Sequence, residues 1–314
     1  MSISSWIVCP IKPRPTTICG SHGGPPITAN RVQLKDGRHL AYRESGVKKT
    51  DALFKIEVME ELGVYMVGFD RAGYGESDPN PNRDVRTAAL DVEELADALG
   101  LGPKFYLFGH SLGNHAVSGA LKYIPQRLDG AVLMAPVINY WWPGFPPELA
   151  SESYNKQEVG DQWALRVAYY APNILHWWME QSWLPNSTAI KGTTYLPNKR
   201  DAEIQKRRIA DGSHAKKMDR VTQQGKYESI YRDMKVMFGK WEFDPMDLPE
   251  PPFPVHLFQG DEDGLVPVTL QRYIANKLSW IKYHELPSTG HYLSAVPGFG
   301  DKVLKTVFGN PSSD

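Results

Sequence analysis

Apolar residues along the chain fall into short continuous runs and into longer stretches at helical spacing. The continuous runs predict strands that are buried on both faces, as in a parallel sheet. They span residues 64–69, 105–109, 130–137 and 255–260, and a further strand is predicted over residues 281–286. Helical spacing predicts helices over 87–99, 114–124 and 270–278 and within 295–308. This alternation predicts an α/β fold with a mostly parallel central sheet and helices on both faces.

The N-terminal part of the chain departs from this pattern. Residues 31–34 and 39–43 flank Asp36-Gly37, which predicts a hairpin ahead of the parallel strands. Before it, residues 1–29 are rich in proline and glycine and predict an extended arm.

Between residues 138 and 251 the strand–helix alternation stops. The segment is helix-like and holds seven of the nine tryptophans. We therefore expect a core domain made of residues 30–137 and 252–310, with an inserted helical cap at 138–251. The tryptophans are expected to pack in the cap core, with some of them lining an apolar ligand pocket.

Composition narrows the class of protein. A chain of 314 residues with 41 % hydrophobic residues can bury a large core. Its formal net charge of −1 gives no sign of a nucleic-acid partner. Two cysteines, Cys9 and Cys19, are too few for a disulfide framework and suit a cytoplasmic location. No apolar run reaches the ~18 residues of a membrane span. No residue pattern indicates a metal, an organic cofactor or an oligomeric state.

The segment Gly109-His110-Ser111-Leu112-Gly113 follows the predicted strand at 105–109 and precedes the predicted helix at 114–124. A Gly-x-Ser-x-Gly sequence in that context is a nucleophile elbow, a tight turn that lifts the serine hydroxyl out of the sheet. We therefore expect Ser111 to be a nucleophile and the Leu112 N–H to donate to an oxyanion. His110 is expected to point away from Ser111.

A serine nucleophile needs a histidine base and a carboxylate that orients the histidine. Asp263 follows the predicted strand at 255–260, and His291 follows the one at 281–286. Parallel strands place such loops at one edge of the sheet. Taken alone, Asp263 also suits an ordinary turn, and His291 an ordinary loop. The order Ser111, Asp263, His291 favours a triad. Residues 199–220 mix basic and acidic side chains and predict a solvated helical face.

Several longer motifs resemble the plant branch of the α/β-hydrolase superfamily, a group of esterase-like proteins. They lie at Cys19–Pro26, Asp36–Tyr42, Phe69–Asp78, Asn139–Gly144, Trp241–Met246 and Gln259–Val268. The resemblance implies hydrolysis of small apolar carboxylic esters by Ser111, Asp263 and His291. It also leaves membrane association open, because relatives commonly carry an apolar N-terminal segment. An epoxide hydrolase is not favoured, because that chemistry places aspartate where Ser111 stands. Lyase or cofactor-free oxygenase chemistry by the same triad stays open.

One departure from that family changes the expectation of activity. The resemblance implies a third strand that ends in His-Gly and supplies a second oxyanion donor, but residues 46–63 contain no histidine. Their apolar positions predict a helix over 51–62 instead, with the third strand missing and the gap closed by rearrangement or by an intruding segment. Splicing or an imprecise gene model would produce such a deletion. The alternative is therefore a catalytically impaired or non-catalytic ligand-binding protein.

Overall fold

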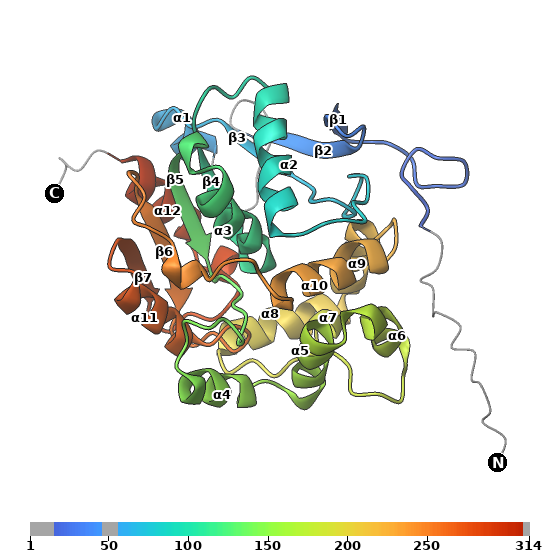
Figure 1. Ribbon diagram of the computed structural model, residues 1–314. Coiled ribbons are helices and arrows are strands. Elements are labelled where there is room, and N and C mark those ends of the chain that lie inside the picture. The colour runs from blue at the N-terminus through green and yellow to red at the C-terminus, as the bar shows by residue number, and fades with distance from the viewer. Residues whose placement is uncertain (1–15, 46–55, 310–314) are drawn as a thin grey trace, which may run out of the picture.

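Two sheets form the strand framework of residues 16–45 and 56–309, the part of the chain that the computed structural model describes (Figure 1). The first is antiparallel, in the order β1-β2-β3, and the second is parallel, in the order β4-β5-β6-β7. The strands are β1 (Asn30–Gln33), β2 (His39–Ser45), β3 (Met66–Phe69), β4 (Phe105–His110), β5 (Leu128–Met134), β6 (Val255–Gly260) and β7 (Ile281–Leu286).

These strands agree closely with the expected ones, and so do the helices between them. The hairpin of β1 and β2 has Val32 opposite Leu40. The matching helices are α2 (Val85–Ala98), α3 (Asn114–Tyr123), α11 (Val268–Lys277) and α12 (Phe299–Phe308). Helix α2 begins earlier than its apolar spacing predicted because Asp84 and Thr87 form a capping box, which satisfies free N–H groups of the first turn.

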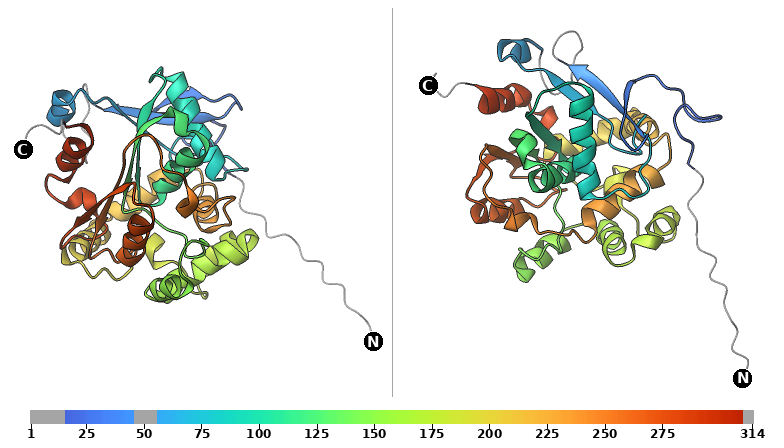
Figure 2. Two further views of the ribbon diagram at one scale, coloured as in Figure 1. Left: turned by 60° about the vertical axis from the view of Figure 1, so that its left-hand side comes forward. Right: turned by 45° about the horizontal axis from the view of Figure 1, so that its top comes forward.

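Helices cover both faces of the parallel sheet (Figure 2). Apolar residues of α2, α3 and α11 belong to the main core cluster, which also holds Leu107 and Leu133 of the sheet. On the opposite face, α1 (Ile56–Glu61) and α12 pack with Phe258, which is fully buried. Burial on both faces explains the continuous apolar runs of β5 and β6. The α/β fold class expected from the sequence is confirmed.

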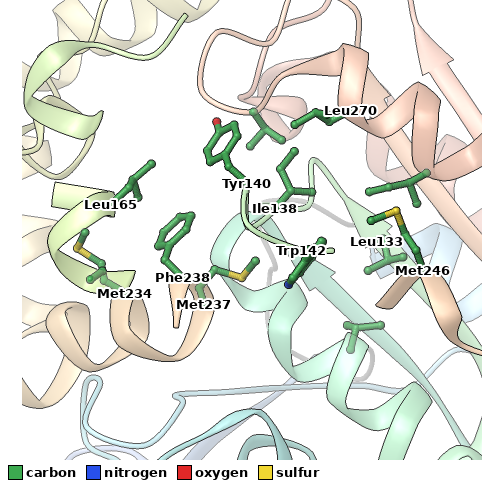
Figure 3. Packing of buried hydrophobic residues seen from close by; sticks show 14 of the residues in the cluster. Leu133, Ile138, Tyr140, Trp142, Leu165, Met234, Met237, Phe238, Met246 and Leu270 are labelled. Atoms are coloured by element: carbon green, nitrogen blue, oxygen red, sulfur yellow. The ribbon is translucent and has the colours of Figure 1, made fainter. Parts of the chain in front are cut away.

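The chain between β5 and β6 forms helices that gather beyond the carboxyl ends of the parallel strands (Figure 1). They are α4 (Pro147–Asn155), α5 (Val159–Tyr170), α6 (Leu175–Glu180), α7 (Thr188–Lys191), α8 (Lys199–Ala210), α9 (Ser213–Val221) and α10 (Arg232–Phe238). Figure 3 shows Leu165 of α5 and Met234 of α10 converging with Tyr140, which follows β5. The insertion therefore shares the main core cluster with the sheet, and its division into a separate cap stays a prediction.

The two sheets separate between β3 and β4, which share no ladder hydrogen bonds. A cavity of about 1100 Å³ lies between these strands. Within residues 16–45 and 56–309, the expected closure of a gap by rearrangement or by an intruding segment is therefore not found. Helix α1 lies inside the helix predicted for 51–62, of which residues 51–55 are outside the described residues.

Side chains tie the antiparallel sheet to the rest of the molecule. Asp233 of α10 is fully buried and accepts a hydrogen bond from the Tyr74 hydroxyl at 2.8 Å. The same carboxylate pairs with Arg71 and Arg83, which lie between β3 and α2. Paired in this way, a buried carboxylate avoids the large cost of an isolated charge. The loop after β3 is thereby fixed to the inserted helices.

The predicted N-terminal arm has no helix or strand over residues 16–29, but hydrogen bonds attach it to the rest of the molecule at several points. Cys19 is buried, and its N–H donates to Gln224 at 2.8 Å. Gln224 in turn donates to the carbonyls of Gly75 and Ser77. The arm is therefore anchored on the loop after β3. Cys9 lies outside the described residues.

Candidate active site

Ser111 lies at the sharp turn between β4 and α3. Its φ of 52° is in the left-handed region, which non-glycine residues adopt rarely and mostly at constrained sites. The turn itself is a short 3₁₀ segment, Ser111–Gly113. A Cβ on Gly109 would lie 2.7 Å from Cγ2 of Val117, so this position needs glycine. Asn114 holds the turn by donating to the Ser111 carbonyl at 2.9 Å.

The structure brings Ser111, His291 and Asp263 into one hydrogen-bonded row. The Ser111 Oγ lies 3.0 Å from Nε2 of His291, and Nδ1 of His291 lies 2.9 Å from Oδ2 of Asp263. Asp263 follows β6, and His291 follows β7, so both lie at the carboxyl edge where the sequence placed them. A histidine between a hydroxyl and a carboxylate can take the hydroxyl proton at Nε2 while Nδ1–H stays bound to the carboxylate.

Four donors hold the Asp263 carboxylate. Its Oδ1 accepts from the N–H groups of Leu265 and Val266, both at 2.9 Å. Its Oδ2 accepts from Gln259 Nε2 at 3.0 Å as well as from His291. Burial alone would raise the pKa of Asp263, but the charge and hydrogen bond of His291 and the two N–H groups lower it. Asp263 is therefore ionised at neutral pH and faces Nδ1–H of His291.

The His291 ring is buried, and burial by itself would lower its pKa. The charge of Asp263 and its hydrogen bond outweigh that effect, so the pKa of His291 is raised from the usual 6.5. A raised pKa makes the imidazole a stronger base for the Ser111 proton.

Sequence reasoning missed a second carboxylate beside His291. Asp201, in the first turn of α8, accepts hydrogen bonds from the main-chain N–H groups of His291 and Tyr292. It is buried, as is Ile204, whereas most other residues of this helix are at least partly exposed. The prediction of a solvated face is therefore wrong at these two positions. No signal in the sequence linked Asp201 to His291, because the contact joins segments far apart in the chain.

Leu112 and His110, the other residues expected near the site, flank Ser111 in the chain. Leu112 lines the same cavity as Ser111, and its carbonyl accepts a 2.7 Å hydrogen bond from Nδ1 of His115. The His110 ring centroid is 5.5 Å from that of His291, and His110 lines the larger cavity between β3 and β4 rather than the one beside Ser111. It is thus separated from the Ser111 cavity, as expected.

A cavity of about 320 Å³ opens beside Ser111 and His291. The residues that line it are mostly apolar or aromatic, and many belong to the inserted helices. The lining residues include Tyr74, Val137, Tyr140, Leu165, Met218, Met234 and Phe238. None of the tryptophans in the described residues lines this cavity, so the expectation that some would do so is wrong. The few polar side chains at its wall include Gln157 and His214.

Comparison with known proteins agrees with the α/β fold. The sequence profile of the family described as "alpha/beta hydrolase fold" matches residues 56–296. The chain belongs to this family. Among curated proteins, this α/β-hydrolase is similar to salicylic acid-binding protein 2 of Nicotiana tabacum, with 22 % identity over 188 residues, which cover 52 % of this chain and 69 % of the relative.

Solved structures similar to this α/β-hydrolase share its fold at low sequence identity. A bromoperoxidase from Bacillus anthracis has a TM-score of 0.58 at 14 % identity, covering 90 % of this chain and 100 % of that chain. An esterase from a Rhodococcus species has a TM-score of 0.57 at 14 % identity, covering 90 % and 99 %.

Within residues 16–45 and 56–309, no helix has the length and apolar character that crossing a membrane requires. In the same ranges, no group of three or more His, Cys, Asp or Glu side chains is arranged to hold a metal ion.

Proposed function

We propose that this α/β-hydrolase cleaves small apolar carboxylic esters, with Ser111 as nucleophile, His291 as base and Asp263 as the group that orients His291. The Ser111 Oγ attacks the ester carbonyl carbon while Nε2 of His291 takes its proton. Collapse of the tetrahedral intermediate breaks the carbon–alkoxy bond, and Nε2 returns the proton to the alcohol. Water then attacks the acyl-enzyme by the same proton transfers and releases the acid.

The observation that carries this proposal is the row Ser111–His291–Asp263, with distances of 3.0 and 2.9 Å, at the wall of an apolar cavity. A cavity of about 320 Å³ suits a small ligand. The name of the Rhodococcus relative, an esterase, supports the same reaction class. The name of the tobacco relative, salicylic acid-binding protein 2, supports a small carboxylic acid as product or ligand.

The second candidate is a catalytically impaired or non-catalytic protein that binds the same ligands. The resemblance to esterase-like plant proteins implies that a strand and a His-Gly loop are missing between β2 and β3. The separation of β3 from β4 favours this candidate, because the cavity between them reaches Gly113, beside the expected oxyanion donor Leu112. The loss of one of two oxyanion donors lowers turnover on the order of 10²–10³-fold. The proposed esterase is therefore slow.

Hydrolysis of p-nitrophenyl acetate by the purified chain tests the two candidates. The expected result is slow hydrolysis that Ser111→Ala abolishes and that Ser294→Ala, at an exposed serine in the same region as His291, leaves unchanged. Hydrolysis that persists in Ser111→Ala rejects the mechanism. No hydrolysis by the wild-type chain, with saturable binding of salicylate, supports the binding protein instead.

A further inference from the structure

The polar side chains that line the cavity beside Ser111 are of two kinds, those that already have a partner in the protein and those that have none. Among the first kind, the Tyr74 hydroxyl donates to Asp233 at 2.8 Å, and the Ser187 hydroxyl donates to Asp161. Asp161 accepts two further hydrogen bonds from the start of α7. These groups are satisfied within the protein and need nothing from a ligand.

Three other polar side chains line the same cavity without a hydrogen-bond partner among the described residues. They are Tyr140, Gln157 and His214. All three belong to the chain inserted between β5 and β6: Tyr140 follows β5, Gln157 lies between α4 and α5, and His214 is in the first turn of α9. The insertion therefore supplies the polar groups that are available to a ligand, whereas the loops of the sheet supply the triad.

Tyr140 is the most deeply buried of these three residues. Only 8 % of it is exposed, whereas Gln157 and His214 are half-buried. Its ring packs edge-on against Tyr154, with 5.4 Å between the centroids, and Figure 3 shows the hydroxyl at the end that points away from Leu133 of β5. A buried hydroxyl without a hydrogen bond costs free energy, and the cavity is the side from which a partner can reach it.

The Tyr140 hydroxyl keeps its proton at neutral pH. Burial raises the pKa of Tyr140, and the charge of Asp263 raises it further. A protonated phenol can both donate and accept a hydrogen bond, as can the side-chain amide of Gln157 and a neutral imidazole at His214. The three groups together therefore suit a ligand group that also donates and accepts.

The charges around the cavity disfavour an ionised ligand group. In the part of the chain that the structure describes, no lysine or arginine lines the cavity, so a second carboxylate on the ligand would be buried without a cation. Asp161 lines it, but its carboxylate already accepts the hydrogen bonds of Ser187 and α7. A neutral hydroxyl group meets both conditions, because it carries no charge and can donate and accept.

We propose that the ester cleaved at Ser111 carries a neutral hydroxyl group in addition to its ester bond, and that the Tyr140 hydroxyl binds this group. Gln157 and His214 supply further hydrogen bonds from the insertion. The preferred substrate is then a largely apolar hydroxy-ester rather than a plain alkyl or aryl ester. This inference rests on the proposed ester hydrolysis for the reaction, and Tyr140 determines which ester is preferred.

The test compares methyl 3-(4-hydroxyphenyl)propanoate with methyl 3-(4-methylphenyl)propanoate. The two esters are similar in size, and their para groups are too far from the ester bond to change its reactivity. The wild-type chain is expected to cleave the hydroxyl ester with the higher kcat/KM. Tyr140→Phe removes only the phenol oxygen and should lower the ratio of the two kcat/KM values about tenfold, because the ligand hydroxyl loses its partner. A fall of less than about twofold would overturn the proposal.

Tyr231→Phe is the matched control for the loss of a buried phenol. Tyr231 is also buried in the insertion and belongs to the same core cluster as Tyr140, but it does not line the cavity. The ratio of the two kcat/KM values should keep its wild-type value in this variant. An equal fall in both variants would show a general effect of removing a buried hydroxyl and would exclude the assignment to Tyr140.

Binding of the same two intact esters to Ser111→Ala needs no catalysis and separates this inference from the proposed function. Isothermal titration calorimetry is expected to show tighter binding of the hydroxyl ester, and the difference should disappear when Tyr140→Phe is added. Equal affinities in Ser111→Ala would overturn the role of Tyr140, whatever the wild-type activity. Tighter binding of the hydroxyl ester, with no hydrolysis of either ester by the wild-type chain, would reject the esterase and retain Tyr140 as the group that binds the hydroxyl.

Discussion

Asp263→Asn keeps the shape of the Asp263 side chain and removes the charge that faces His291. In the native site Oδ1 takes the N–H groups of Leu265 and Val266 at 2.9 Å. The amide oxygen of asparagine can take that place, because it is the only acceptor of the new side chain. The amide nitrogen then faces Nδ1 of His291 and Nε2 of Gln259, where the native carboxylate accepted both hydrogen bonds.

A donor opposite Nδ1 forces the imidazole proton onto Nε2, so His291 can no longer take the proton of Ser111. The expected loss in kcat/KM is on the order of 10⁴, the size known for this change in serine proteases. It corresponds to about 5.5 kcal/mol of transition-state stabilisation. Because the charge that raises the pKa of His291 is also removed, that pKa should fall in the variant.

The assay is hydrolysis of p-nitrophenyl acetate as a function of pH, with Tm measured in parallel. Asp201→Asn is the matched control, since Asp201 contacts the main chain of His291 rather than its ring. An asparagine there can still accept hydrogen bonds, so a loss of about tenfold or less is expected. Equal losses in the two variants, or more than a tenth of wild-type activity in Asp263→Asn, would refute the reasoning.

Four further outcomes are expected. A fluorophosphonate probe should label the chain slowly and only when Ser111 is present, because we propose that one of two oxyanion donors is missing; rapid stoichiometric labelling would contradict this. The kcat/KM should rise with pH and level off, with its midpoint above 6.5, because His291 must be neutral to act and its pKa is raised; a midpoint below 6.5 would contradict the Asp263 contact. Phe258→Ala, at a fully buried position, should lower the free energy of unfolding in urea by about 3–5 kcal/mol. Transcripts sequenced across residues 46–60 should include a longer form that encodes a strand ending in His-Gly; its absence from all transcripts would contradict a deletion by splicing.

The central strands could be predicted because β5 and β6 are buried on both faces. β6 was expected at the residues where it lies, since a largely apolar run with turn residues after it has few other structural solutions. The positions of Ser111, Asp263 and His291 followed from the same pattern. Each residue comes shortly after a parallel strand, and parallel strands end at a common edge.

Contacts between distant segments could not be predicted in this way. Asp201 contacts the His291 segment across 90 residues of chain, and Cys19 contacts Gln224 across 205. Such contacts depend on how the inserted helices dock on the sheet, which apolar spacing does not specify. For the same reason the wall of the Ser111 cavity was misjudged: Tyr140 and Phe238 line it, and the abundant tryptophans do not.

Unfolding should not be fully cooperative, because β3 and β4 share no ladder hydrogen bonds. The hairpin and β3 are joined to the remaining molecule by helix α2 packed on α3, by Asp233 with its two arginines, and by Met66, which packs against the core cluster around Phe258. Units that share no sheet ladder can open separately. Residues 30–45 and 66–69 then form a subdomain that melts before the parallel sheet, and a single Tm would describe neither part.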